Sequence, residues 1–197
     1  MSMLGVGVGG DTKGAGTLVI KQPKKGEYIF TVPDTREGWC AIAECILLSY
    51  AGKAIQPQSI DYSLIRPAGT PIKTFGGIAA GPEPLRQLVE VDIPSILDPL
   101  IGKSITSTAI VDIFNYIGKC VVSGNVRRSS EIMFGEPTDE DFLLLKDPSL
   151  HKAELEDRRW SSNNSVIVDT TTDFSRLAEL TSRNGEPGFF WLKNAQN

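Results

Sequence analysis

Segments with the composition of short β-strands alternate with amphipathic helices along this chain, and this alternation constrains its fold more than any other feature. An irregular succession of strands and helices is typical of α/β proteins. Several strands have no obvious neighbour to pair with, which indicates a segment cut from a larger fold. Strands are predicted at 17–21, 27–32, 61–65, 165–169 and 188–193, and helices at about 35–50, 84–91, 107–121, 139–146 and 173–183.

Capping residues define the ends of two of these helices. Asp34 and Glu37 have the spacing of a capping box before the first helix, and Gly52 suits its C-terminal end. Asp173 can cap the last helix, which Gly185 closes. These signals are local and predict helix positions without any knowledge of tertiary contacts.

The helix that begins at Thr106 or Ser107 is followed by a polar loop, residues 124–130. Gly124 permits backbone conformations that bring a ligand close. The two adjacent arginines of the loop offer planar pairs of donors that suit phosphate, and its hydroxyls and amide can bond a base or ribose. A solvated turn with surface arginines explains the same residues equally well, so both interpretations stay open at this point.

Residues 5–10, GVGVGG, formally satisfy the dinucleotide-binding pattern G-x-G-x-x-G. That pattern needs a strand before it, a helix after it and an acidic residue about 20 positions on. Only four residues precede the first glycine, and the glycine run continues to residue 16. We therefore predict a flexible glycine-rich loop and disfavour a dinucleotide-binding enzyme.

The composition is that of an ordinary globular protein, with 41% hydrophobic and 22% charged residues among 197. This length predicts one domain or a large piece of one. A net charge of −4 argues against a general nucleic-acid binder. No apolar stretch approaches the roughly 20 residues of a membrane span, and no secretory signal begins the chain. We expect no membrane partner and a cytoplasmic location.

Cysteine usage agrees with a reducing compartment. Cys40, Cys45 and Cys120 are odd in number and form no C-x-x-C pair. His151 is the single histidine, and the spacing of the cysteines gives no indication that they converge on it. No metal site is predicted.

A series of motifs in fixed order is similar to a known family. The chain resembles the adenosylcobalamin-dependent ribonucleoside-triphosphate reductases, the class II ribonucleotide reductases of the monomeric type. The resemblance extends over essentially the whole chain. Its motifs are VPDTREGW at 32–39, IRP with a glycine at 65–69, FGG with GP at 75–82, GK at 118–119, GNVRRS at 124–129, RW with SNNSV at 159–166, and NGEPG at 184–188.

The resemblance implies a fold, an activity and partners. The family fold is a ten-stranded α/β barrel with a central finger loop. Residues 1–197 would be the central part of that barrel domain, including the effector-site insertion and the specificity loop, and would be incomplete at both ends. The implied activity is reduction of ribonucleoside triphosphates to deoxyribonucleoside triphosphates by cobalamin-initiated thiyl radical chemistry. Thioredoxin or a similar dithiol would supply electrons, and a dNTP effector would select the substrate base.

The resemblance also implies which residues carry the regulatory site. Arg66 and Lys73 match basic positions that hold effector phosphates, and two cations suit a triphosphate. The segment 123–130 would be the specificity loop between effector and substrate, and residues 5–10 would follow an early barrel strand. The loop residues assigned to the substrate side are Ser123, Gly124, Asn125, Arg127, Arg128 and Ser129.

No catalytic residue is assigned within the chain. The family's thiyl cysteine belongs to an Asn-Pro-Cys-Gly-Glu motif that would lie beyond residue 197, and Cys40, Cys45 and Cys120 do not fall on its cysteine positions. Most of the cobalamin surface would also lie outside this segment. The isolated chain is therefore expected to be inactive. The alternative hypothesis is a stand-alone nucleotide-binding or regulatory module that retains a dNTP effector site.

Overall fold

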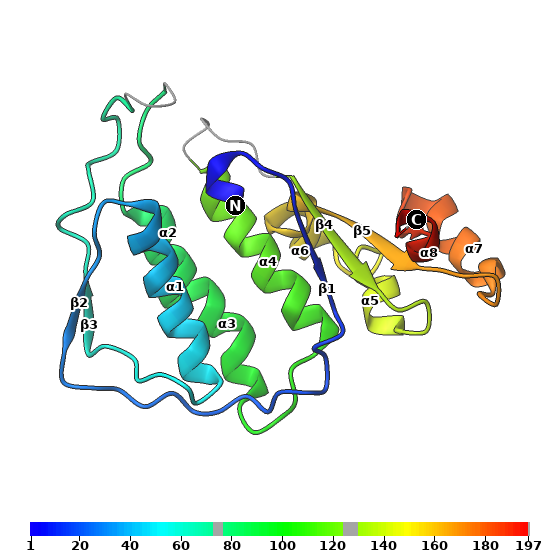
Figure 1. The fold of residues 1–197 in the computed structure, drawn as a ribbon, viewed down its shortest axis with the longest axis horizontal. Helices are drawn as coiled ribbons and strands as arrows, with labels where there is room; N and C mark the ends of the chain where they lie inside the picture. The colour runs from blue at the N-terminus through cyan, green and yellow to red at the C-terminus, as the bar shows by residue number, and fades with distance from the viewer. Residues whose placement is uncertain (73–76, 124–129, 197) are drawn as a thin grey trace.

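The computed structural model describes residues 1–72, 77–123 and 130–196 and consists of a helical part and a sheet part (Figure 1). The strands are β1 (Val8–Asp11), β2 (Ile29–Thr31), β3 (Ser59–Asp61), β4 (Glu131–Gly135), β5 (Ser162–Ile167) and β6 (Gly188–Phe190). The α-helices are α1 (Arg36–Tyr50), α2 (Glu83–Gln87), α3 (Ile93–Leu97), α4 (Ser107–Val122), α5 (Glu140–Leu144), α6 (Lys152–Asp157), α7 (Phe174–Asn184) and α8 (Leu192–Ala195). Shorter helical turns are η1 (Ser2–Leu4), the π-helical η2 (Leu88–Asp92), η3 (Asp98–Leu100) and η4 (Arg159–Ser161).

The sheet part has four parallel strands in the order β1-β4-β5-β6. Helices α4, α5 and α7 bury one face of this sheet, and the strand residues on that face include Met133 and Val166. Because parallel strands need crossover connections, helices must lie between them along the chain. The strand order and these helices make the sheet part an α/β unit.

Glycines let β1 lie close to its neighbours. A Cβ atom at Gly10 would lie 3.0 Å from Phe114 Cζ of α4 and 3.1 Å from Met133 Cε of β4. A larger side chain would push β1 away from both elements. Our prediction of a flexible glycine-rich loop is therefore wrong for residues 8–11, which form a strand.

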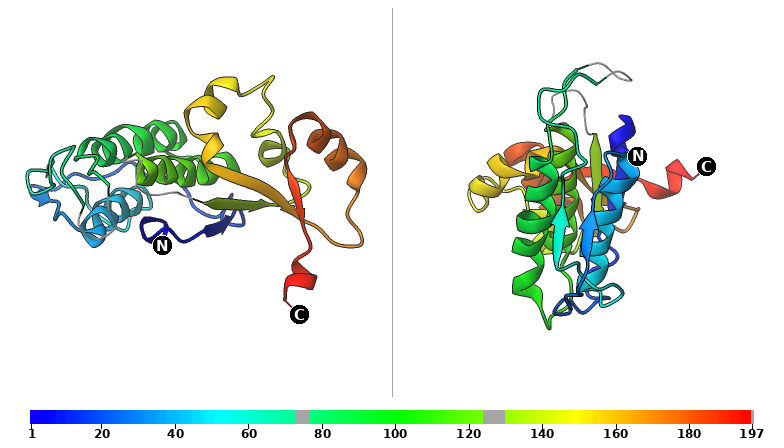
Figure 2. Two further views of the ribbon diagram at one scale, coloured as in Figure 1. Left: turned by 90° about the horizontal axis from the view of Figure 1, so that it is seen from above. Right: turned by 90° about the vertical axis from the view of Figure 1, so that its left-hand side faces the viewer.

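The helical part packs η2 and α3 against one side of α4, and α1 packs in turn against η2 and α3. Viewed from above, it occupies one end of the long axis and the sheet part occupies the other (Figure 2). Strands β2 and β3 form a separate two-stranded parallel sheet. The helical core contains, among others, Val32, Ile42, Ile46, Leu85, Val89 and Ile93.

Helix α4 belongs to both cores. Val111 is buried in the core of the sheet part, whereas Ile113, Tyr116 and Cys120 are buried in the core of the helical part. A helix that is buried on two sides cannot shift without disturbing both. Helix α4 is thereby held in place by both parts of the molecule, and Cys120 holds its last turn in the helical core.

Helix positions agree well with the sequence analysis. Thr106 caps α4 through the Ala109 N–H, and Asp173 caps α7 through the Ser175 N–H. The first helix also forms as predicted, but its cap is Thr35 rather than Asp34. The helix predicted at 84–91 continues to 97 because a π-turn precedes Pro94.

Strands agree less well. Residues 17–21 form only an isolated bridge between Val19 and Ser104, and the other predicted strands are shorter or shifted by two or three residues. Strands β1 and β4 were not predicted. Within the part of the chain that the structure describes, no helix has the length and apolar character needed to cross a membrane.

Candidate functional site

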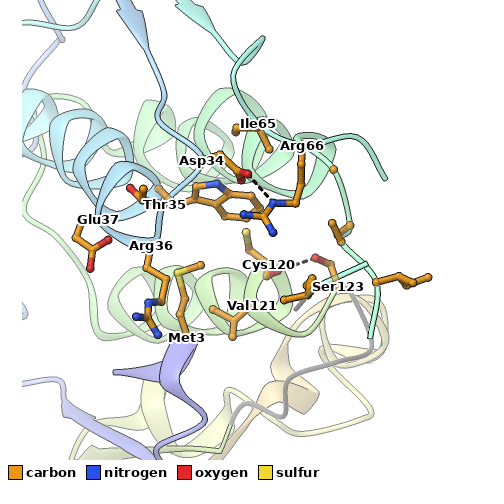
Figure 3. A pocket seen from close by; sticks show the side chains of 16 residues that line it. Met3, Asp34, Thr35, Arg36, Glu37, Ile65, Arg66, Cys120, Val121 and Ser123 are labelled. Atoms are coloured by element: carbon orange, nitrogen blue, oxygen red, sulfur yellow. Dashed lines mark hydrogen bonds and ion pairs between the residues drawn. The ribbon is translucent and has the colours of Figure 1, made fainter. Parts of the chain in front are cut away.

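A cavity of about 350 Å³ lies between the helical part and the last turn of α4 (Figure 3). Its volume falls within the range of about 300–1,000 Å³ that is usual for small-molecule sites. It is built from η1, the start of α1, residues within 65–72 and 78–81, and the end of α4. Its lining residues are Met3, Asp34, Thr35, Arg36, Glu37, Trp39, Ile65, Arg66, Ile72, Ile78, Ala79, Ala80, Gly81, Cys120, Val121 and Ser123.

Arg66 reaches this cavity already paired with a carboxylate. Its Nε donates to Asp34 Oδ2 at 2.5 Å, and the two side chains are 41% and 30% exposed. Asp34 is available for this contact because Thr35 caps α1, accepting the Gly38 N–H at 3.0 Å. The predicted phosphate-binding residue Arg66 therefore lies in a cavity, and the predicted capping residue Asp34 serves as its counter-ion.

Arg36 is a second arginine on the same cavity, at the first position of α1. It is half-buried, and within the described residues it makes no hydrogen bond or ion pair. The amino-terminal end of a helix also favours negative charge. Sequence reasoning missed Arg36 as a site residue, although the motif at 32–39 contained it.

Apolar side chains form much of the remaining wall. Trp39 and Ile65 belong to the helical core and also line the cavity, which Val121 lines as well. An indole and aliphatic side chains provide the flat apolar surface on which a nucleobase can stack or pack. The cavity thus combines guanidinium groups with an apolar wall, which are the two features that a nucleotide needs.

The end of α4 closes the cavity on the side that leads to the predicted specificity loop. Ser123 Oγ donates to the Cys120 carbonyl at 2.7 Å and so stays attached to the last turn of the helix. Burial, and then the nearby Asp92 carboxylate, raise the pKa of the Cys120 thiol to about 12. Such a thiol stays protonated near neutral pH. The site residues Lys73, Gly124, Asn125, Arg127, Arg128 and Ser129 lie outside the described residues.

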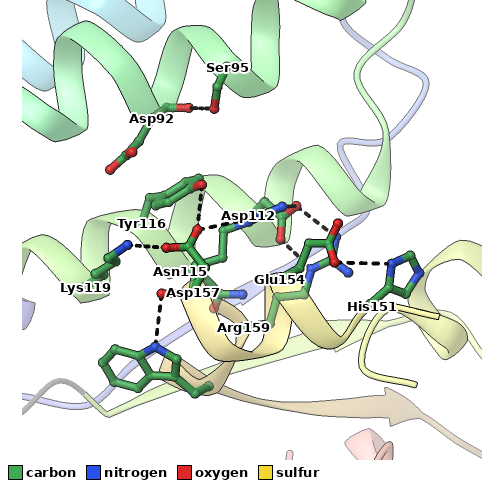
Figure 4. A network of polar contacts seen from close by, with 12 residues as sticks. Asp92, Ser95, Asp112, Asn115, Tyr116, Lys119, His151, Glu154, Asp157 and Arg159 are labelled. Carbon is green, nitrogen blue, oxygen red and sulfur yellow. Dashed lines mark hydrogen bonds and ion pairs between the residues drawn. The ribbon is translucent and has the colours of Figure 1, made fainter. Parts of the chain in front are cut away.

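A second polar cluster joins α4 to the segment before β5 (Figure 4). Asp112 is 2% exposed and accepts from both Arg158 and Arg159, while Asp157 bonds Tyr116 and Lys119. The charged stretch 151–159 predicts a solvated connection or a short helix, and a short helix, α6, forms there. Its end is not solvated, because Arg159 is 3% exposed. This cluster fixes the position of α4.

The family motif at 184–188 also has a structural role. Glu186 accepts from the Asn164 N–H at 3.1 Å and pairs with Lys146 Nζ at 2.9 Å. Asn184 donates to the Lys146 carbonyl. The motif therefore joins the turn before β6 to β5 and to the residues that follow α5. None of these residues lines the cavity.

The cavity does not fit adenosylcobalamin. The 350 Å³ cavity is too small for a corrin ring with its attached nucleotide, and within the described residues no three His, Cys, Asp or Glu side chains cluster as metal ligands. The His151 imidazole Nδ1 lies 3.9 Å from the Glu154 carboxylate.

Comparisons with known proteins give a consistent result. Residues 9–97 match the family described as B12-dependent ribonucleotide reductase, insertion domain. The adenosylcobalamin-dependent ribonucleoside-triphosphate reductase of Euglena gracilis is 44% identical over 199 residues, which cover 99% of this chain and 27% of that protein. A probable enzyme of the same name from Dictyostelium discoideum is also 44% identical, over 98% of the chain and 27% of the relative.

A crystal structure of a B12-dependent, class II ribonucleotide reductase shares the fold. Its TM-score is 0.73 at 34% sequence identity, over 84% of this chain and 23% of that one. The chain spans about a quarter of the length of the curated relatives it matches.

In fold and in sequence, the chain is similar to a segment of nucleotide reductases of the α/β type. The relatives are specifically the adenosylcobalamin-dependent, class II ribonucleoside-triphosphate reductases, and the predicted resemblance to them is confirmed. The predicted fold class, a partial segment of this α/β fold, is also confirmed. The relatives are named as dependent on adenosylcobalamin, which makes it the cofactor of the family.

Proposed function

We propose that this chain is part of a ribonucleotide reductase that converts ribonucleoside triphosphates to deoxyribonucleoside triphosphates, and that the cavity is its dNTP effector site. One observation carries the proposal. Arg36 and Arg66 line a cavity whose opposite wall is the last turn of α4, and that helix leads directly into residues 124–129. A bound nucleotide would touch the support of the specificity loop.

Charge and shape assign roles to the cavity residues. Arg66, together with Lys73, would hold the effector phosphates, and Arg36 adds a guanidinium that sequence reasoning did not assign. Trp39 would contact the base or sugar. Ser123 would begin the specificity loop, with Gly124, Asn125, Arg127, Arg128 and Ser129 on the substrate side. Because α4 is buried on two sides, movement at its end would pass to the loop rather than be absorbed by the helix.

The chain would belong to a single domain of the reductase. Residues 1–197 would form the central part of the catalytic barrel domain, with the effector-site insertion inside 9–97, where the insertion-domain family matches. No catalytic residue is assigned within the chain, and we expect the 197-residue chain alone to be inactive. A dithiol such as thioredoxin would be the reductant, and the setting would be cytoplasmic.

Equilibrium dialysis of the 197-residue chain with labelled dNTPs tests the effector site. We expect binding below millimolar concentration, and a loss of about tenfold for every dNTP in Arg66→Ala, because a charge-assisted contact to phosphate does not depend on the base. Arg176→Ala is the matched control, since Arg176 pairs with Glu140 on the sheet part. If no dNTP binds at millimolar concentration, the proposed site is wrong.

A stand-alone regulatory module is the second candidate, because the cavity residues would serve it equally well. A reductase assay with labelled ribonucleoside triphosphate, adenosylcobalamin and a dithiol examines the expected inactivity. Deoxynucleotide formed by the 197-residue chain alone would contradict that expectation. Binding of dNTPs without turnover is expected of a segment and of a module alike. Restored base selectivity on addition of the remaining reductase sequence would favour the segment.

A further inference from the structure

Asp34 occupies part of the guanidinium that a phosphate would use. The contact runs from Arg66 Nε to Asp34 Oδ2 at 2.5 Å, and both residues line the cavity. A phosphate that reaches the same guanidinium would either displace this carboxylate or lie beside it, and both alternatives cost free energy. The cavity therefore contains an internal competitor for its own anionic ligand.

We propose that the nucleotide phosphate displaces the Asp34 carboxylate from Arg66 on binding. The ion pair therefore lowers the affinity of the site and sets the nucleotide concentration at which the site is filled. This inference rests on the proposed function, because it takes the ligand to be a nucleoside triphosphate. In the ligand-free state Arg66 is held by Asp34. In the bound state phosphate takes the guanidinium, and the Asp34 carboxylate returns to solvent.

The ion pair is not required to hold the fold. Thr35, not Asp34, caps α1, and both paired side chains are more than a quarter exposed. Ion pairs of this exposure contribute little to stability. Arg36, by contrast, makes no hydrogen bond or ion pair within the described residues and can take up phosphate without giving up a partner. Phosphate binding therefore breaks an existing ion pair at Arg66 but not at Arg36.

Glu37 provides a matched control for Asp34. Glu37 lines the same cavity, but among the described residues its carboxylate has no hydrogen-bonded or ion-paired partner. Asp34→Asn and Glu37→Gln each remove one negative charge from the cavity. A general gain in attraction for anions would appear in both variants, whereas release of Arg66 would appear only in Asp34→Asn.

Titration calorimetry at fixed ionic strength, with a dNTP and separately with inorganic tripolyphosphate, tests the exchange. We expect Asp34→Asn to bind both about two- to fivefold more tightly than the unaltered chain, the factor that matches the free energy of an exposed ion pair. Glu37→Gln should gain less than half as much. Arg66→Ala should remove the gain, so that Asp34→Asn has no effect in that background. Asp34→Ala is the second variant, and thermal unfolding verifies that each variant is folded.

The outcomes separate this inference from the proposed function. If the unaltered chain binds and Asp34→Asn binds no more tightly than Glu37→Gln, the exchange is wrong while the effector site stands. Weaker binding by Asp34→Asn would likewise overturn it and would mean that the carboxylate assists the bound state. If neither ligand binds to any variant, the proposed site and the exchange are both wrong.

Discussion

Asp112 and Arg159 form a two-point ion pair in the interior of the protein. Arg159 Nε lies 2.8 Å from Asp112 Oδ1, its Nη2 lies 3.0 Å from Oδ2, and the side chains are 3% and 2% exposed. Arg158 adds a third contact to the same carboxylate, at 2.8 Å. This arrangement joins α4 to the segment before β5 and so connects the support of the cavity to the centre of the sheet.

Replacing Asp112 by Asn should lower the free energy of unfolding by about 3–5 kcal/mol. The substitution leaves a buried guanidinium without its counter-charge, and loss of one partner of a buried pair carries a cost of that order. Urea unfolding followed by circular dichroism measures the change. Glu140→Gln breaks the exposed pair with Arg176 and should cost less than about 1 kcal/mol. Equal losses in the two variants would contradict a special role for burial.

The same carboxylate should make stability depend on pH in the acid range. Burial alone would raise the pKa of Asp112, but the hydrogen bonds from Arg159 and Arg158 outweigh it and hold this pKa below its ordinary value. A lowered pKa means that the stabilisation is complete above the unfolded value of about 4 and is lost as pH falls through the folded value. The difference in stability between the unaltered chain and Asp112→Asn should therefore shrink below about pH 4. A difference that stays constant from pH 7 to pH 3 would be inconsistent with this.

Local signals predict the helices of this protein better than its strands. Thr106 and Asp173 act on N–H groups two or three residues away, so their roles can be deduced from sequence. Strand β4 instead exists through its pairing with β1 and β5, and Val8 lies opposite Glu131, far away in the chain. Pairing at such separation leaves no local pattern, and the glycines that permit β1 resemble a loop.

The candidate site shows the same division. The family resemblance pointed to Arg66, and the structure places this residue in a cavity. Arg36 was missed because the cavity is assembled from segments near residues 3, 36, 66 and 121, and only tertiary structure brings these together. The resemblance also gave no reason to expect Asp34 beside Arg66, since its spacing to Glu37 suggested a helix cap. The predicted roles of Lys73 and of residues 124–129 stay predictions, because they lie outside the described residues.

Gly135 at the end of β4 should not tolerate a side chain. A Cβ atom there would lie 2.3 Å from Cδ1 of the Phe142 ring, and Phe142 is 1% exposed in the core. Gly135→Ala should therefore destabilise the protein by about 1–3 kcal/mol, the usual cost of overpacking, as measured by urea unfolding. At Gly14 a Cβ would meet only Ile110 at 3.6 Å, an ordinary contact, so Gly14→Ala should change stability by less than about 0.5 kcal/mol. Similar losses for both glycines would show that backbone freedom, not ring contact, is responsible.

The three cysteines should react with iodoacetamide at different rates. Cys40 is exposed, Cys45 is partly buried and close to the Ile55 carbonyl, and Cys120 is buried at the end of α4. With a pKa of about 12, only about one Cys120 thiol in ten thousand is ionised at pH 8, and the thiolate is the reactive form. Mass spectrometry of labelled peptides should show Cys40 modified first and Cys120 at least about tenfold more slowly. Urea should abolish the difference, because unfolding removes both the burial and the Asp92 carboxylate that raise the pKa.

Rapid labelling of Cys120 in the folded chain would contradict this prediction. It would mean that the last turn of α4 opens readily and does not form a fixed wall of the cavity.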